Sequence, residues 1–312
     1  HLYNYTMIPF LKLIRVKNLV VILLTMIGVA FHLRKHHPYE VIDFNSIHYG
    51  LLIFSTLIIA AAGHLINDYF DLKADRINKP EELVLTKYLQ KRWAILGHWL
   101  LNIVAFGIAI YLSWSNHSLL FVFIHLVSIN LLWFYSVSWK RKLLLGSVVL
   151  AVLPALVIFL STWYFQILNE SDQAYSPYLE KTWSTYLNYH YAQFLAVCAF
   201  LVTLSREILK DVHDMPGDEL LNANTIPRKI GAKKATWLAL ITLQFPAFLF
   251  IVLKLFGAFT MPSTFAAVTL GGLAILFASQ LIWFALQPEK ASKWLLFHYK
   301  IAIPLGLLTL FF

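Results

Sequence analysis

Cysteine and charged residues are scarce in this chain of 312 residues. Its single cysteine, Cys198, excludes an intrachain disulfide. Only 13% of the residues are charged, whereas 59% are hydrophobic, and the mean hydropathy is +0.68. A soluble globular domain carries about 25% charged residues. The composition therefore indicates a membrane protein.

Long apolar runs divide the chain at regular intervals. A helix needs about 20 apolar residues to cross about 30 Å of hydrocarbon, and lipid tolerates no exposed backbone. The first run has no small-residue cleavage site, so we interpret it as a membrane helix rather than a secretory signal. No linker or low-complexity stretch separates a second domain. We predict an all-α, polytopic membrane protein, a single domain over 1–312 with nine transmembrane helices. They are expected at 8–33, 49–67, 93–113, 117–136, 143–166, 190–209, 235–256, 262–286 and 294–312.

The net charge is +9, and the basic residues are distributed as the predicted topology requires. Alternate connections, counted from the N-terminus, hold 20 of the lysines and arginines, and the opposite connections hold 4. Such a bias marks the cytoplasmic side of a membrane protein. It predicts a cytoplasmic N-terminus and an outside C-terminus. Because the topology explains the basic charge, nothing in the sequence supports nucleic-acid binding.

Acidic residues are few, and they are concentrated. Two segments, 67–75 and 206–218, hold seven of the sixteen, and each lies at the end of an apolar run. The topology puts both segments, and the bases at 140–142, on the cytoplasmic side. We therefore expect the two segments to converge on one site.

The spacing of the acids indicates a metal. If the helices continue, each segment forms one stripe, because residues four or seven positions apart share a helical face. All the ligands are hard oxygens, with no cysteine or paired histidine, so Mg²⁺ is favoured over zinc or copper. Interleaved bases suit a diphosphate. The stripes are Asn67, Asp71 and Asp75, with Asp68 beside them, and Glu207, Asp211, Asp214 and Asp218.

Purely structural interpretations of these residues also stay open. Acidic stripes at helix ends also occur as solvated loop faces. The basic cluster at 140–142 is also typical of a topology anchor, and His64 and His213 are compatible with ordinary hydrogen bonds between helices.

Two motifs carry a family resemblance. Residues 67–75 match the pattern N-D-x-x-D-x-x-x-D, which resembles the UbiA-type intramembrane prenyltransferases. Residues 206–218, Arg-Glu-Ile-x-Lys-Asp-x-x-Asp-x-x-Gly-Asp, resemble the branch that contains the geranylgeranylglyceryl phosphate geranylgeranyltransferases. Arg15 and Asn18 are similar to that family's Arg-x-x-Asn. Two departures stand out: Ser147 replaces a frequent asparagine, and the stretch 81–86 lacks the usual arginine and glycine.

The resemblance implies a fold, a reaction and a set of site residues. The fold is UbiA-like, with the helices around a central cavity. The reaction is Mg²⁺-dependent transfer from a polyprenyl diphosphate, most simply geranylgeranyl, to a prenylated glycerol phosphate in the membrane. The metal ligands implied are Asn67, Asp68, Asp71, Asp75, Asp211, Asp214 and Asp218, of which Asp68, Asp71, Asp75, Asp211 and Asp214 are catalytic. The substrate-binding residues implied are Arg15, Asn18, Tyr135, Lys140, Arg206 and Lys210.

Two alternatives to this function remain. An aromatic acceptor, as in quinone synthesis, belongs to the same reaction class. The altered stretch 81–86 motivates a non-catalytic membrane subunit or a transporter instead. The sequence predicts neither the donor chain length nor the oligomeric state.

Overall fold

The structure is a computed structural model that describes residues 10–35, 45–78, 84–175, 183–220, 223–255, 263–286 and 292–312. These residues are nearly all helical, which confirms the all-α prediction. Two strands of two residues each occur among them, β1 (Lys142–Leu143) and β2 (Asn224–Thr225).

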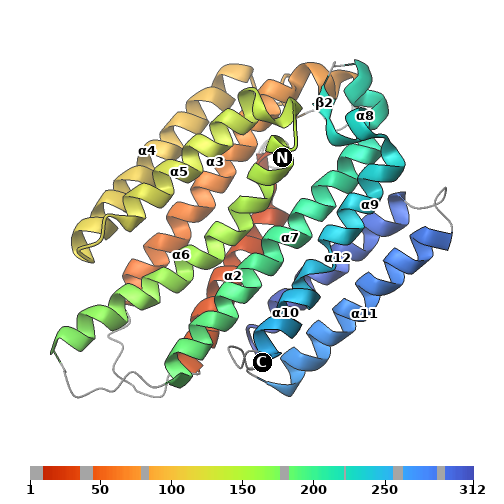
Figure 1. The fold of residues 1–312 in the computed structure, drawn as a ribbon. Coiled ribbons are helices and arrows are strands. Elements are labelled where there is room, and N and C mark those ends of the chain that lie inside the picture. Colours follow the sequence, from red (N-terminus) through yellow and green to blue (C-terminus); the bar gives the residue numbers. More distant parts are fainter. Residues whose placement is uncertain are drawn as a thin grey trace, which may run out of the picture. The chain divides into compact units, whose positions relative to one another are not determined.

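Most of the helices match the predicted apolar runs (Figure 1). Among the described residues, eight helical segments are long and apolar enough to cross a membrane. The predicted ninth run is the shorter helix α12, which contains Pro304 and whose apolar part is Leu295–Leu308. The count of nine spans and the central cavity stay predictions. The helices are α2 (Val16–Lys35), α3 (Ser46–Asn78), α4 (Lys91–Ser115), α5 (Leu120–Val137), α6 (Leu145–Tyr175), α7 (Trp183–Leu220), α8 (Ile226–Ile230), α9 (Ala232–Thr242), α10 (Phe245–Leu255), α11 (Thr264–Leu286) and α12 (Ser292–Leu308), with the 3₁₀ turn η1 at Trp139–Arg141.

The chain forms two compact units. Unit 1 comprises His1–Leu23 and Phe44–Lys142, and unit 2 comprises Leu24–Asp43 and Leu143–Phe312. The boundary falls inside α2 and again after η1. Each acidic segment therefore belongs to a different unit.

In unit 1, α3 packs against both α4 and α5 (Figure 1). Two glycines permit the close approach. A Cβ on Gly63 would lie 2.8 Å from the side chain of Leu132 in α5, and one on Gly97 would lie 3.2 Å from Leu65 in α3. The buried side chains of Ser55 and His125 form a hydrogen bond of 2.8 Å between α3 and α5.

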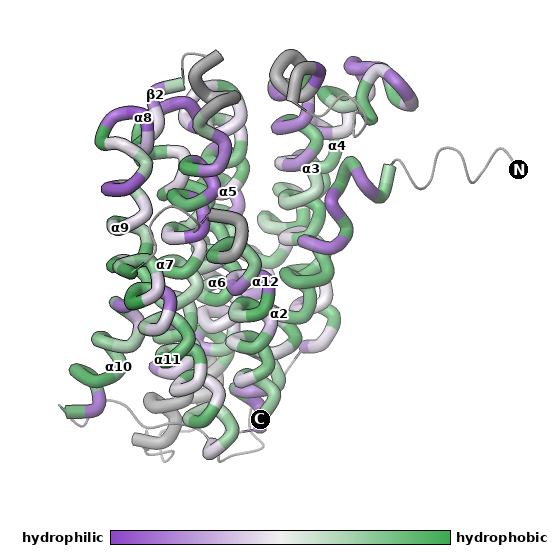
Figure 2. Tube along the Cα trace, turned by 90° about the vertical axis from the view of Figure 1, so that its right-hand side faces the viewer, coloured by the Kyte–Doolittle hydropathy of each residue, from purple (hydrophilic) through white to green (hydrophobic). Residues whose placement is uncertain are grey.

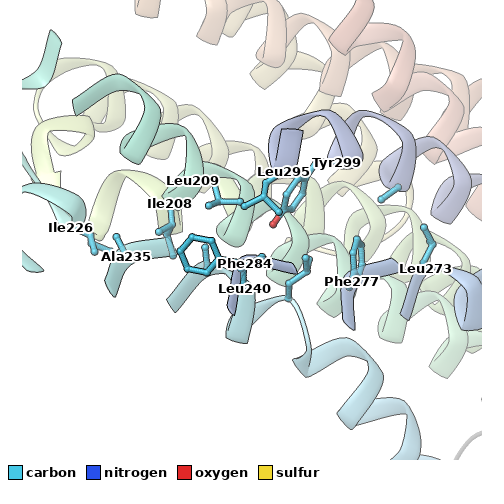
Figure 3. Packing of buried hydrophobic residues seen from close by; sticks show 13 residues of the cluster. Ile208, Leu209, Ile226, Ala235, Leu240, Leu273, Phe277, Phe284, Leu295 and Tyr299 are labelled. Atoms are coloured by element: carbon cyan, nitrogen blue, oxygen red, sulfur yellow. The ribbon is translucent and has the colours of Figure 1, made fainter. Parts of the chain in front are cut away.

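In unit 2, α7 packs against α6, α9 and α12. Its core joins apolar side chains of α7, α8, α9, α11 and α12 (Figure 3). Two linked hydrogen bonds cross that core. The Tyr299 hydroxyl lies 2.7 Å from Ser205 Oγ, which donates to the Ala239 carbonyl at 2.6 Å. Because Ser205 has one proton and gives it to the carbonyl, Tyr299 is the donor to Ser205.

Large apolar side chains face outward on the long helices. Trp114 of α4 is 77% exposed and Ile275 of α11 is 73% exposed. Hydrophobic residues cover the long middles of the helices, whereas hydrophilic residues gather at α8 and at one end of α3 (Figure 2). Water disfavours so much exposed apolar surface, but hydrocarbon does not. The chain is an integral membrane protein.

Candidate functional site

The first acidic segment lies on a helix that continues past the apolar run. α3 extends to Asn78 and so includes the whole motif at 67–75. The prediction that Asn67, Asp71 and Asp75 lie on one helical face is confirmed for the backbone. The side chain of Asp75 is outside the described part of the structure.

Arg15 forms an ion pair with Asp68 inside unit 1. Its Nη2 lies 2.9 Å from Asp68 Oδ1. Arg15 sits in a break between a helical turn at 10–13 and the start of α2, with a backbone φ of +52°. A residue with a side chain pays about 1–3 kcal/mol for such a conformation. Asn18, which the resemblance pairs with Arg15, is exposed in the first turn of α2.

Lys140 forms an ion pair with Asp71, also inside unit 1. The lysine lies in η1, which follows the end of α5, and its side chain is only 12% exposed against 24% for Asp71. A simple topology anchor would extend into water, as exposed Arg141 does next to it. Tyr135 is half-buried near the end of α5. The structure thus brings four predicted site residues of unit 1 together as two base–acid pairs.

Asn67 contributes a buried oxygen to the same helix. Its side-chain Oδ1 has no hydrogen-bond partner among the described residues. An unsatisfied buried acceptor costs about 1–3 kcal/mol unless water or an ion occupies it. An amide oxygen beside carboxylates suits a hard cation, so the residues of this segment fit Mg²⁺.

The second acidic segment lies on α7, in unit 2. α7 extends to Leu220, so it includes the motif at 206–218, and the predicted stripe is again confirmed for the backbone. Asp211 is half-buried and Asp214 is exposed. The side chain of Asp218 is outside the described part.

Arg206 and Lys210 contact Glu207 rather than the aspartates. Arg206 forms an ion pair with the buried Glu207, and Lys210 Nζ lies 3.8 Å from Glu207 Oε2. Sequence reasoning placed Glu207 in the acidic stripe but missed its role as the counter-charge of these bases. The three-residue spacing of Glu207 and Lys210 was a usable signal, because residues three apart share a helical face.

Ser147 is a second residue whose contact sequence reasoning missed. It lies in the first turn of α6, and its hydroxyl donates to Asp211 Oδ2 at 3.1 Å. The available signal was its position after Gly146, at the start of a helix.

The described part of the chain shows no complete group of metal ligands. No group of three or more histidines, cysteines, aspartates and glutamates is close enough there to bind an ion. Residues 81–83 of the altered stretch are outside the described residues. The rest begins a turn in which the Thr86 amide donates to the Leu89 carbonyl at 2.8 Å.

Comparisons with known proteins identify the family to which the chain belongs. A model of the UbiA prenyltransferase family matches residues 18–301. The digeranylgeranylglyceryl phosphate synthase of Pyrococcus horikoshii is 31% identical over 256 residues, which cover 78% of this chain and 77% of that protein. The enzyme of the same name from Metallosphaera sedula is 30% identical over 237 residues, covering 75% and 72%.

Solved structures show the same fold. One, from work on digeranylgeranylglyceryl phosphate synthase in membranes, has a TM-score of 0.71 at 21% identity and covers 98% of this chain and 97% of its own. A UbiA homologue from Archaeoglobus fulgidus, bound to DMAPP and Mg²⁺, has a TM-score of 0.57 at 15% identity and covers 97% of both chains. The family model extends over both units and both acidic motifs, so this chain belongs to the UbiA prenyltransferase family.

Proposed function

We propose that this prenyltransferase transfers a polyprenyl group, most simply geranylgeranyl, from its diphosphate to the hydroxyl of a prenylated glycerol phosphate. The product is an ether lipid. The observation that carries the proposal is the pair of long helices, α3 and α7, which each carry acidic residues paired with bases: Asp68 and Asp71 on α3, and Glu207 on α7. The names of the relatives from Pyrococcus horikoshii and Metallosphaera sedula support the choice of acceptor.

Seven side chains would hold magnesium. They are all oxygen donors, and the buried, unpartnered Oδ1 of Asn67 supports the assignment. When bound, Mg²⁺ supplies positive charge to the leaving diphosphate. The proposed ligands are Asn67, Asp68, Asp71, Asp75, Asp211, Asp214 and Asp218.

The bases of the site would bind the diphosphate itself. Arg15 and Lys140 neutralise Asp68 and Asp71 in the structure. We propose that both turn to phosphate oxygens when substrate and cation are present, because a doubly charged cation then replaces them at the carboxylates. Arg206 and Lys210 would add charge beside the second motif. Asn18 and Tyr135 would complete the binding site for the substrate.

The transfer breaks one C–O bond and makes another. The allylic carbon separates from the diphosphate, which leaves with the bonding electron pair. The acceptor hydroxyl oxygen then attacks the allylic cation, and its proton leaves to the released diphosphate. The protein's contribution is the fixed positive charge around the leaving group, which stabilises the transition state more than the substrate.

We propose that the two units form one domain with its site at the cytoplasmic side. The bias of lysines and arginines between alternate connections supports a cytoplasmic N-terminus and an outside C-terminus. From the end of α3 to the end of α7 the chain passes through four candidate spans, α4, α5, α6 and α7 itself, which is compatible with both motifs lying on the same side.

Labelled geranylgeranyl diphosphate tests the function. The full chain in detergent is given Mg²⁺ and either geranylgeranylglyceryl phosphate or an aromatic hydroxy acid. We expect a labelled ether lipid with the first acceptor, and its loss on Asp71→Asn or Asp211→Asn. Ser161→Ala is the control, because the Ser161 hydroxyl donates to the Val157 carbonyl of its own helix and the residue is not a proposed ligand. A prenylated aromatic product would replace the proposed acceptor, and no turnover with either would refute the enzyme assignment for these substrates.

A further inference from the structure

Ser147 holds one carboxylate of the second motif through a contact between helices. It is buried, at 5% exposure, and its Oγ donates to Asp211 Oδ2 at 3.1 Å. The contact joins the start of α6 to α7, and these two helices pack along much of their length. The carboxylate on α7 is therefore tied to a fixed point on a neighbouring helix.

The position of Ser147 in α6 explains why its hydroxyl is available. Serines and threonines inside a helix usually donate to the carbonyl four residues earlier. Ser161 and Thr162 of α6 do this, with Val157 and Ile158. The corresponding carbonyl for Ser147 is that of Leu143, which precedes the helix. Its hydroxyl bonds across to Asp211 instead.

The hydrogen bond from Ser147 brings no charged group to Asp211. The serine hydroxyl is neutral, whereas Asp68 and Asp71 pair with bases, so this hydrogen bond does not itself neutralise the carboxylate. The first turn of α6 also presents the positive end of a 31-residue helix. Both effects orient the carboxylate without cancelling its charge.

A cation with strict geometry makes such orientation valuable. Mg²⁺ requires ligands near octahedral positions at about 2.0–2.1 Å. Groups that fix metal ligands by hydrogen bonds change metal affinity about 10- to 100-fold when they are lost.

We infer that Ser147 is a positioning residue that sets the orientation of Asp211 for metal binding. This inference rests on the proposed function, in which Asp211 is a magnesium ligand. Ser147 touches neither metal nor substrate and acts only through the carboxylate. An asparagine side chain also offers a donor, so it could fill the same role.

A magnesium titration of stability tests the inference without catalysis. The full chain in detergent, with inorganic diphosphate at a fixed concentration, is titrated with Mg²⁺ and its Tm is recorded. For Ser147→Ala we expect the Mg²⁺ concentration at half-maximal stabilisation to rise about 10-fold or more. Ser147→Asn should restore a value close to wild type. Ser161→Ala, the same substitution deeper in the same helix, should leave it unchanged.

A double-mutant cycle separates positioning from general stability. In an Asp211→Asn background, Ser147→Ala should add no further change to the magnesium midpoint, because the residue acts through the carboxylate. Equal midpoints for wild type and Ser147→Ala would overturn the inference and leave the metal site standing. A wild type that Mg²⁺ does not stabilise would overturn both. If Ser147→Ala lowers Tm in EDTA but keeps the wild-type midpoint, the serine is structural and the inference fails.

Discussion

Lys140→Gln should destabilise the metal-free protein and at the same time strengthen its response to Mg²⁺. Lys140 pairs with Asp71, and both side chains are mostly buried. Two unit charges about 4 Å apart attract by about 4 kcal/mol at an effective dielectric constant of 20. Desolvation of both groups offsets most of that attraction. The variant leaves the carboxylate of Asp71 without its base, which costs about 1–3 kcal/mol.

The gain in magnesium response follows from competition. In the wild type, a cation must displace Lys140 before it reaches Asp71. If the ion pair of Lys140 with Asp71 contributes about 1–3 kcal/mol, its removal lowers the Mg²⁺ concentration at half-maximal stabilisation about 5- to 150-fold. The upper end of this range applies only if Mg²⁺ breaks the ion pair completely in the wild type. The KM for the prenyl diphosphate should rise, because the same lysine is proposed to bind its oxygens.

Three measurements on the same variant decide the point. Tm in EDTA should fall, the Tm midpoint in Mg²⁺ should move to lower concentration, and the KM of the donor should increase. Arg141→Gln is the matched control, because Arg141 is next to Lys140 in the chain, has an exposed side chain and is not a proposed ligand. If Lys140→Gln behaves like Arg141→Gln in all three, the lysine is a topology anchor and the competition argument is wrong.

Three further substitutions test the packing that supports the site. Ser55→Ala leaves the buried ring nitrogen Nε2 of His125 without its hydroxyl partner and should cost about 1–3 kcal/mol of stability, measured by Tm in detergent. Ser205→Ala should destabilise more than Tyr299→Phe in the same assay, because it removes a partner from both the tyrosine hydroxyl and the Ala239 carbonyl, which then keeps its bond from the Leu243 amide; the reverse order would contradict this reasoning. Gly63→Val should lower Tm more than Gly63→Ala, because overpacking by the larger side chain costs about 1–3 kcal/mol of stability. Equal effects would mean that α3 and α5 have room to separate.

The sequence was sufficient for the helices and for the backbone of both motifs. Apolar length predicts spans without knowledge of packing, and the four- and seven-residue spacings hold because α3 and α7 continue to Asn78 and Leu220. The ninth run was harder, since α12 contains Pro304 and its apolar part is short.

Side-chain partners were not predictable to the same degree. Four bases were assigned to phosphate by family resemblance, yet each pairs with an acid in the structure. Partner choice depends on which helix faces which, and one sequence does not contain that information. The break at Arg15 was also missed, because no glycine stands at this left-handed position. The three-residue spacing did indicate the pairing of Glu207 with Lys210, but Glu207 was assigned to the acidic stripe instead.

The acidic side chains of the two motifs have different partners, and this difference suits a charged substrate. In unit 1, Arg15 and Lys140 cancel the charges of Asp68 and Asp71. In unit 2, both bases beside the motif contact Glu207, while Asp211 bonds to a neutral serine. The first motif therefore has cations to release to a diphosphate, whereas the hydrogen bond from Ser147 to Asp211 brings no cation to the second motif. A site in which every acid was paired with a base would have to break an ion pair for each metal ligand, and the cost would reduce the affinity that the diphosphate complex needs.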